Sequence, residues 1–176
     1  MGCGKGEIVN ILQKEDFEYI TLSSMVREEA RRLGVPEERE KLMEVGNFMR
    51  VIGGAGILAK RALQKIKASG HDKWVVDGIR NPAEIDELKS SHDAYIVGVS
   101  ADKNLLVERI MKRARESDAK TRDDILRKIE REWGKDESED GQQVGKCMEK
   151  ADYVIENNGT LEDLSKNFLN YYQQLL

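Results

Sequence analysis

Short apolar runs alternate along the chain with longer stretches of helical character. The short runs predict four strands, at residues 18–22, 74–76, 94–99 and 153–155. Most of the apolar residues in these runs are consecutive, which is typical of strands buried on both faces, as in a parallel sheet.

Helices are predicted between the strands, at residues 6–13, 24–33, 37–50, 55–68, 82–89, 102–115, 121–133 and 160–175. Gly34 stops the second helix, a glycine-rich break at residues 53–56 separates the third from the fourth, and Thr160 is the predicted N-cap of the last. A regular alternation of strands and helices over 176 residues predicts one domain with a doubly wound α/β fold and a parallel sheet.

Composition argues against several classes of protein. Lys and Arg number 29 against 33 Asp and Glu, so the net charge of −4 disfavours binding to duplex DNA, and we expect no nucleic-acid partner. No apolar run approaches the roughly 18–20 residues that cross a bilayer, so we expect no membrane partner. The two cysteines, Cys3 and Cys147, make no CxxC pair, which excludes a zinc ribbon and favours a cytoplasmic location.

A glycine-rich loop opens the chain, with the residues Gly2-Cys3-Gly4-Lys5-Gly6-Glu7. Glycines let backbone N–H groups fold around a phosphate, the N-terminus of the following helix adds positive potential, and a lysine in the position of Lys5 reaches the β- and γ-phosphates. The full pattern GxxxxGK[ST] has a hydroxyl where this chain has Gly6, and its first glycine would fall two positions before Met1. A merely flexible start is the alternative interpretation of the loop taken alone.

In P-loop folds an apolar strand precedes the phosphate loop and runs through the middle of the sheet. Only Met1 stands ahead of the loop in this sequence. We therefore expect that strand and the first glycine of the loop to be absent here. Without the strand, a hole is expected at the centre of the sheet, with a loss of stability larger than that of an ordinary point substitution.

Two further segments place charged residues directly after predicted strands. Residues 21–27 read TLSSMVR and end at Arg27, and residues 74–80 read WVVDGIR, with Asp77 at the end of the apolar run and Arg80 at the end of the segment. A carboxylate at the C-terminal end of a parallel strand is placed to lie near Mg²⁺. Solvated surface arginines and a simple Asp-Gly turn are the competing interpretations.

Together with the glycine-rich loop, these segments resemble those of the P-loop kinases of small nucleotides, namely the nucleoside monophosphate kinases of the adenylate kinase type and the dephospho-CoA kinases. The resemblance covers almost the whole chain. It implies the three-layer fold of P-loop NTPases with an inserted helical lid, ATP as phosphoryl donor, Mg²⁺ as cofactor and a small nucleotide as acceptor. Residues 34–68 are expected to bind the acceptor, and residues 113–146 to form the lid.

The resemblance also assigns roles to single residues. Catalytic roles are expected for Lys5, Asp77, which would act on Mg²⁺ indirectly, and Arg113. Contacts with ATP are expected from Gly2, Gly4, Lys5, Gly6, Glu7 and Arg109. Contacts with the acceptor phosphate are expected from Arg27, Arg50 and Arg80. A solvated basic helix is the competing interpretation of Arg109 and Arg113, and Ser24 stands where the monophosphate kinases have an aspartate.

The resemblance leaves two acceptors open. The segments that end at Arg27 and Arg80 resemble those of monophosphate kinases, whereas residues 151–162 resemble the C-terminal segment of dephospho-CoA kinases. We favour a (deoxy)nucleoside monophosphate, because the first two segments are the ones that would touch the acceptor. A nucleotide-binding module without catalysis, a small NTPase switch and a structural interaction protein are the alternatives, and the oligomeric state is left open.

Overall fold

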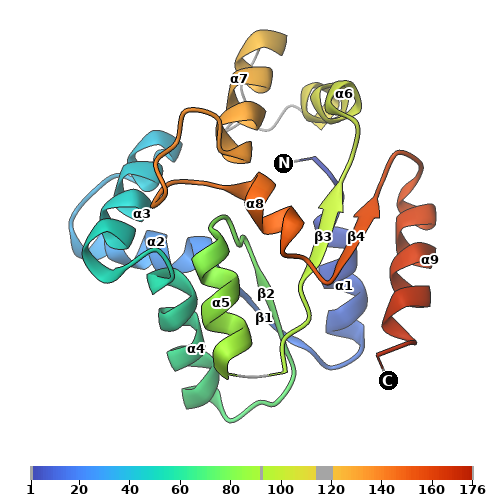
Figure 1. Cartoon of the computed structure of the whole chain (residues 1–176), viewed down its shortest axis with the longest axis horizontal. Helices are drawn as coiled ribbons and strands as arrows, with labels where there is room; N and C mark the ends of the chain where they lie inside the picture. Colours follow the sequence, from blue (N-terminus) through green and yellow to red (C-terminus); the bar gives the residue numbers. More distant parts are fainter. Residues whose placement is uncertain (1, 92, 114–120, 176) are drawn as a thin grey trace.

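The computed structural model of the chain describes residues 2–91, 93–113 and 121–175. Its strands are β1 (Glu18–Thr21), β2 (Trp74–Asp77), β3 (Val97–Ser100) and β4 (Tyr153–Glu156). Its helices are α1 (Lys5–Lys14), α2 (Leu22–Arg32), α3 (Arg39–Gly53), α4 (Ile57–Ser69), α5 (Pro82–Ser91), α6 (Lys103–Arg113), α7 (Arg122–Trp133), α8 (Val144–Glu149) and α9 (Leu161–Tyr172). Figure 1 shows the strands at the centre, with helices around them.

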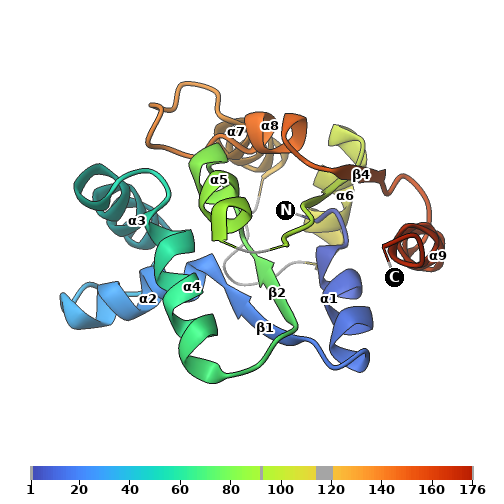
Figure 2. The ribbon, with the colours of Figure 1, turned by 60° about the horizontal axis from the view of Figure 1, so that its bottom comes forward.

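Helices cover the strands on both faces, as Figures 1 and 2 show. On one face α1 and α9 pack against β4 through a cluster that includes Ile8 and Phe168. On the other face α4 and α5 pack through a cluster that includes Ile85 and Leu88. A third cluster joins α2, α3 and α4 beside β1. These layers confirm the predicted α/β class.

The strands of the described residues form two separate sheets of two parallel strands each. β1 pairs with β2 in a register that sets Thr21 opposite Asp77. β3 pairs with β4 in a register that sets Ser100 opposite Glu156. In each pair the C-terminal ends of the two strands therefore lie side by side. Parallel α/β folds bind their ligands at this edge of the sheet.

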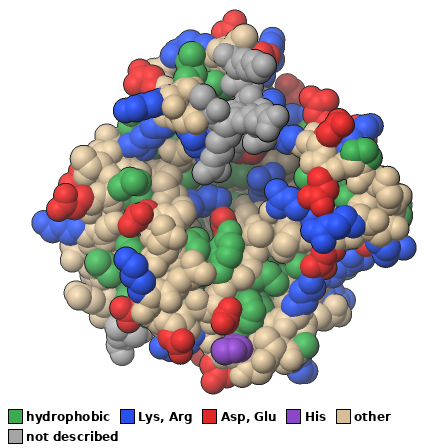
Figure 3. Space-filling model, turned by 180° about the vertical axis from the view of Figure 1, so that it is seen from behind, with side chains coloured by type: hydrophobic (Ala, Val, Ile, Leu, Met, Phe, Trp, Pro, Cys, Tyr) green, Lys and Arg blue, Asp and Glu red, His purple; other side chains and the backbone are tan. Residues whose placement is uncertain are grey.

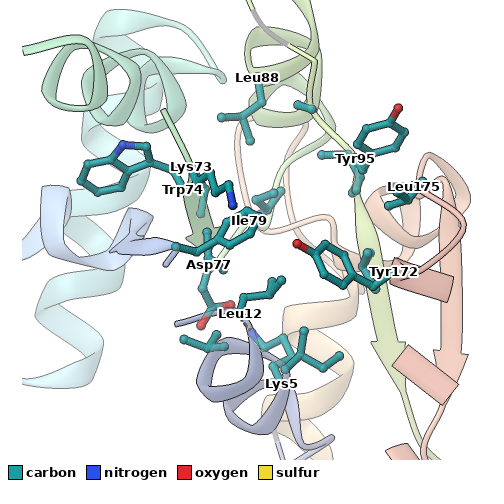
Figure 4. A pocket seen from close by; sticks show the side chains of 18 of the residues that line it. Lys5, Leu12, Lys73, Trp74, Asp77, Ile79, Leu88, Tyr95, Tyr172 and Leu175 are labelled. Atoms are coloured by element: carbon teal, nitrogen blue, oxygen red, sulfur yellow. Dashed lines mark hydrogen bonds and ion pairs between the residues drawn. The ribbon is translucent and has the colours of Figure 1, made fainter. Parts of the chain in front are cut away.

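An apolar cavity of about 490 Å³ separates the two sheets. All four residues of β2 border the cavity, and Val97 and Val99 of β3 border it from the other side. Apolar side chains of the surrounding helices line it too: Ile8, Val9, Leu12, Leu63, Ile66, Leu88, Phe168 and Tyr172. The charged residues Lys5, Asp72, Lys73 and Asp93 also border it. Figure 4 shows this space in close view. The hole expected at the centre of the sheet is thus observed between β2 and β3, where a strand parallel to both would fit.

Two of the predicted strands are longer than the observed ones, and each has a local cause. The side chain of Thr21 accepts a hydrogen bond from the N–H of Ser23 and caps α2, so Leu22 belongs to that helix. Residues 94–96 are not part of β3. The N–H of Ile96 donates to the side chain of Asp152, and its carbonyl accepts from the N–H of Asp152, so Ile96 bonds to the turn that precedes β4.

The helix predictions are confirmed to within a few residues, except that α8 was not predicted. The predicted helix at residues 102–115 runs past the described residues, where α6 ends at Arg113. Thr160 is the N-cap of α9, as predicted, and forms a reciprocal capping box with Asp163. No single helix in the described ranges is long and apolar enough to cross a membrane; α3 and α4 reach that length and apolarity only together, across a bend of 86°.

Filling the cavity is expected to stabilise the protein. An apolar strand of five residues, a glycine and one further residue, added ahead of Met1 so that the glycine falls two positions before it, would bury three or four side chains, each worth roughly 1.5–3 kcal/mol before the entropy of ordering is subtracted. One kcal/mol raises Tm by roughly 2–4 °C in a chain of this size. We expect a net rise in Tm of about 5–10 °C in a thermal melt. A polar extension of equal length is the control, and an equal Tm for the two extended chains would contradict the assignment of the cavity.

Candidate functional site

The glycine-rich loop is folded tightly against the C-terminal part of the chain. Gly2 and Gly4 have φ values of 73° and 96°, in the left-handed region that favours glycine. A Cβ on Gly4 would lie 2.7 Å from the Nδ2 of Asn157, which itself donates to the carbonyl of Cys3 at 2.9 Å. α1 then begins at Lys5 with no side-chain cap, so its first backbone N–H groups point out of the helix end toward the loop.

An ion pair between Lys5 and Asp77 joins the glycine-rich loop to the end of β2. The Nζ of Lys5 lies 2.9 Å from the Oδ1 of Asp77, and their side chains point toward one another in Figure 4. The same carboxylate oxygen accepts from the N–H of Gly78 at 2.6 Å. The hydroxyl of Tyr19, on the neighbouring strand β1, donates to the Oδ2 at 3.4 Å. The structure thus brings the loop and the end of β2 together.

The surroundings of Asp77 keep its carboxylate charged. Burial raises its pKa, but the Lys5 ammonium and the hydrogen bonds from Lys5 and Gly78 outweigh burial, so the pKa lies below the usual value. Burial and the charge of Asp77 both raise the pKa of Tyr19. At neutral pH the site therefore holds an ammonium, a carboxylate and a neutral phenol.

Arg109 lies on the other side of the loop, on α6. Its guanidinium donates to the carbonyls of Asn157 and Gly159, at 2.8 and 2.7 Å. It fixes the turn between β4 and α9, and Asn157 of that turn touches the glycine-rich loop. The position is next to the loop, as the proposed contact with ATP requires, but the contact itself stays a prediction.

A second cavity, of about 460 Å³, opens beyond the ends of β1 and β2. We call it the basic cavity. Among the described residues, seven basic side chains border it: Arg27, Arg39, Arg50, Arg80, Arg113, Lys128 and Arg131. Three acidic side chains accompany them: Glu37, Glu40 and Glu132. Figure 3, the view from behind, shows Lys and Arg side chains around a hollow in the upper half of that face. This excess of positive charge favours an anionic ligand.

The carboxylates of the basic cavity orient its arginines. Arg27 donates to the hydroxyl of Ser23 at 3.2 Å and lies 3.5 Å from Glu37. Glu132 is 2.9 Å from Arg39 and 3.9 Å from Arg80. Burial raises the pKa of Glu132, but the surrounding positive charge, that of Arg80 and Arg39 included, more than offsets burial and lowers it. These contacts hold the arginines in place, while basic side chains still outnumber acidic ones among the described residues of the cavity.

The side chain of Glu84 holds the turn that follows β2, beside the basic cavity. Its carboxylate is fully buried. One oxygen accepts from the Nε and Nη2 of Arg50, at 3.1 and 2.8 Å, and the other accepts from the N–H groups of Arg80 and Asn81, at 2.7 and 3.1 Å. Arg50, predicted to bind the acceptor phosphate, borders the cavity but is 4% exposed and committed to this ion pair. Its contact with an acceptor stays a prediction.

Asn81 extends the same network to the segment before α8. Its Nδ2 donates to the carbonyls of Glu139 and Gly141, at 2.8 and 3.0 Å. The N–H of Gln143 donates back to the carbonyl of Arg80 at 2.6 Å. The turn that carries Arg80 is thus bonded to Glu84 of α5 and to the chain that enters α8, and Glu84 links it to Arg50 of α3.

The two regions expected to surround an acceptor both border the basic cavity. From residues 34–68 it takes mainly residues of α3, and from residues 113–146 it takes Arg113, α7 and Gln142. Residues 121–146 fold as α7, a loop and the start of α8, and residues 114–120 lie outside the described ranges. That these regions act as acceptor domain and lid stays a prediction.

Several residues of the site were not predicted, namely Tyr19, Arg39, Asn81, Glu84, Lys128, Arg131 and Gln142. A signal was present for two of them. Asn81 caps α5 by accepting from the N–H of Ala83, Pro82 follows it, and Glu84 reaches back to the N–H of Asn81. The Glu84 bond is one half of a capping box, with the N-cap side chain bonded one residue earlier, and the order Asn-Pro-x-Glu could have revealed it.

The described residues contain no group of three or more metal-binding side chains. This does not exclude Mg²⁺, because proteins usually hold that ion through one or two carboxylates together with substrate phosphates and water. Asp77, charged and beside the phosphate loop, fits that arrangement.

Comparisons with known proteins agree with this fold. Residues 1–130 match the family described as AAA domain, AAA_17. The UPF0200 protein of Sulfurisphaera tokodaii is 31% identical over 176 residues, which cover 99% of this chain and 93% of that protein. The UPF0200 protein of Thermoplasma volcanium is 33% identical over 167 residues, which cover 92% and 86%. The crystal structure of TT1252 from Thermus thermophilus aligns with a TM-score of 0.56 at 19% identity, covering 100% of this chain and 94% of that one.

The fold, the glycine-rich loop and the Lys5–Asp77 pair define a P-loop NTPase fold with a kinase-like domain. Within that class, the chain belongs to the AAA domain family AAA_17 and to the UPF0200 family.

Removing the Glu84 carboxylate is expected to destabilise the protein strongly. Glu84→Ala leaves the Arg50 guanidinium buried without its partner and deprives two backbone N–H groups of their acceptor. The expected loss is about 3–5 kcal/mol in the free energy of unfolding, measured by urea denaturation. Asp86→Ala, on the same helix at an exposed ion pair with Lys150, is the control and should change it by less than about 0.5 kcal/mol. Similar losses in the two variants would contradict the role given to Glu84.

Proposed function

We propose that the chain is an ATP-dependent phosphotransferase that moves the γ-phosphoryl group of ATP to a (deoxy)nucleoside monophosphate. One observation carries the proposal: Asp77 faces Lys5 of the phosphate loop, and the next residue, Gly78, borders the basic cavity. A donor at the loop and an acceptor in the cavity would therefore meet at a single turn. Phosphoryl transfer needs this alignment, and charge neutralisation, more than covalent chemistry from the protein.

On the donor side, the backbone N–H groups at the start of α1 and the Lys5 ammonium would bind the phosphates of ATP. Lys5 would exchange its ion pair with Asp77 for phosphate oxygens, and Asp77 would become available to hold Mg²⁺ indirectly. Mg²⁺, when bound, supplies positive charge that the β- and γ-phosphates need during transfer. Arg109 would lie against the adenine, beside the turn that it fixes.

On the acceptor side, Arg27 and Arg80 would bind the acceptor phosphate. A planar guanidinium group can donate two parallel hydrogen bonds to two oxygens of one phosphate. Arg113 lies on α6, which also carries Arg109, and it borders the basic cavity. It would contact the phosphoryl group during transfer. Closure of residues 113–146 over the basic cavity would exclude water, which otherwise competes as an acceptor.

The location of the C-terminal segment supports a monophosphate over dephospho-CoA. Residues 151–162 carry the resemblance to dephospho-CoA kinases, and their turn is bonded to Arg109 and to the phosphate loop, not to the basic cavity. The resemblance there concerns the donor side and gives no support to that acceptor. A nucleotide-binding module without catalysis would use the same donor site, and it predicts ATP binding without turnover.

The test is phosphoryl transfer by the chain extended with the apolar strand and glycine, supplied with Mg-ATP and a panel of nucleoside monophosphates. Lys5→Ala should lower the rate by at least about a hundredfold, since it removes a charge that stabilises the transferring group. Lys14→Ala, an exposed lysine at the end of the same helix, is the matched control and should keep the rate. The proposal would be overturned if Lys5→Ala left the transfer rate unchanged. It would also be overturned if the extended chain without a substitution transferred no phosphoryl group to any monophosphate.

A further inference from the structure

Asn157 bonds to the glycine-rich loop at the peptide group between Cys3 and Gly4. Its Nδ2 donates to the carbonyl oxygen of Cys3 at 2.9 Å. This peptide group is trans, so the Cys3 carbonyl and the Gly4 N–H point in opposite directions. Among the described residues, no backbone carbonyl accepts from that N–H. By holding the carbonyl, Asn157 therefore leaves an N–H group of the loop directed away from itself.

The glycine at position 4 makes this orientation easy to lose. Gly4 has a φ of 96°. Rotation of the Cys3–Gly4 peptide group by half a turn would bring that angle to a negative value, and glycine adopts both signs of φ about equally readily. In the rotated form the Cys3 carbonyl would face a phosphate bound by the loop, and the Gly4 N–H would be withdrawn from it. Phosphate binding therefore needs a contact that fixes this peptide group.

Asn157 is itself held by bonds that do not involve the loop. Its N–H donates to the carbonyl of Ser100, at the end of β3, at 2.8 Å. Its own carbonyl accepts from the Nη1 of Arg109 at 2.8 Å. The loop is packed directly against this turn, because a Cβ on Gly4 would lie 2.7 Å from both the Nδ2 of Asn157 and the Cδ2 of Leu164. The amide thus offers the loop a fixed point of attachment.

The single bond of the Asn157 side chain indicates what the amide is for. The residue is 2% exposed, and its Oδ1 has no hydrogen-bond partner among the described residues. A buried polar atom without a partner opposes folding, so stability alone would favour an apolar side chain at this position. The bond that the side chain does make is the one to the Cys3 carbonyl. Its value therefore lies in the conformation of the loop.

We propose that Asn157 is a positioning residue of the phosphate loop. It holds the Cys3 carbonyl away from the phosphates that the loop binds, and it keeps the Gly4 N–H directed at them. Hydrogen bonds to a charged phosphate oxygen are roughly twice as strong as those between neutral groups, so the orientation of one N–H matters for affinity. The inference rests on the glycine-rich loop as the donor site of the proposed function, but it depends neither on the acceptor nor on transfer.

The test measures, by titration calorimetry, how tightly the strand-extended chain binds inorganic tripolyphosphate and ATP, both with Mg²⁺. Asn157→Ala should weaken tripolyphosphate binding at least about tenfold, as expected for one hydrogen bond lost to a charged group. ATP should lose affinity by the same factor, because its base is bound elsewhere. Asn158→Ala is the matched control. Asn158 is the next residue of the same turn, and its exposed side chain accepts from the N–H of Asp102, so this variant should bind like the unsubstituted chain.

The amide proton resonance of Gly4 separates a positioning role from a merely structural one. At saturating tripolyphosphate it should move downfield in the unsubstituted chain, because the N–H donates to a phosphate oxygen. In Asn157→Ala it should not move, although the resonances of Lys5 and Gly6 do. A thermal melt checks that this variant is folded. Asn157→Asp, which has the same shape but no N–H to donate, should also lose the Gly4 shift and serves if the alanine variant does not fold.

Equal affinity for tripolyphosphate in Asn157→Ala and the unsubstituted chain would overturn the inference, as would an equal shift of the Gly4 resonance in both. A Gly4 resonance that stays in place in the unsubstituted chain at saturation would overturn it without any variant. If that chain binds tripolyphosphate but transfers no phosphoryl group, the proposed transfer fails and the same measurements still decide the role of Asn157. If it binds no tripolyphosphate, the inference and the proposed function both fail.

Discussion

The buried carboxylate of Glu84 is the contact on which the geometry of the turn beside the basic cavity depends. It holds the Arg50 guanidinium of α3 and the backbone of the turn that carries Arg80. Burial of an ion pair contributes little net stability by itself, but removal of one member leaves an uncompensated charge, so such a pair fixes a single arrangement strongly. Through Asn81, the same turn is tied to the segment that presents Gln142. The turn that carries Arg80 and the segment before α8 thus share one support.

The region of the glycine-rich loop depends on a different constraint, the alignment of parallel strands. In the register of the parallel strands β1 and β2, Tyr19 lies opposite Val75, and its hydroxyl reaches the carboxylate of Asp77, where Lys5 meets the other oxygen. The cavity between β2 and β3 leaves this end supported by one strand pair on each side. A strand in that cavity would join the two pairs and lead directly into the glycine-rich loop.

Local patterns predicted much of this arrangement. Apolar runs and caps identified most elements, and the motifs around Lys5 and Asp77 identified two residues that the fold brings within 2.9 Å. Predictions that needed long-range contacts were less complete. The residues before β3 bond to the turn around Asp152 instead of extending the strand, and Arg50 is paired with a carboxylate that lies 34 residues further along. The bond from Asn157 to Cys3 spans 154 positions and follows only from the packing of the turn against the loop.

The central claim is that a phosphoryl group passes from the loop to a ligand in the basic cavity. The most direct measurement is the yield of ADP and of phosphorylated acceptor in one reaction, with the sheet completed by a strand ahead of Met1. We expect one phosphorylated acceptor for each ADP, and little ADP when the acceptor is left out. ADP release at the same rate without an acceptor would contradict it, because the chain would then transfer the phosphoryl group to water.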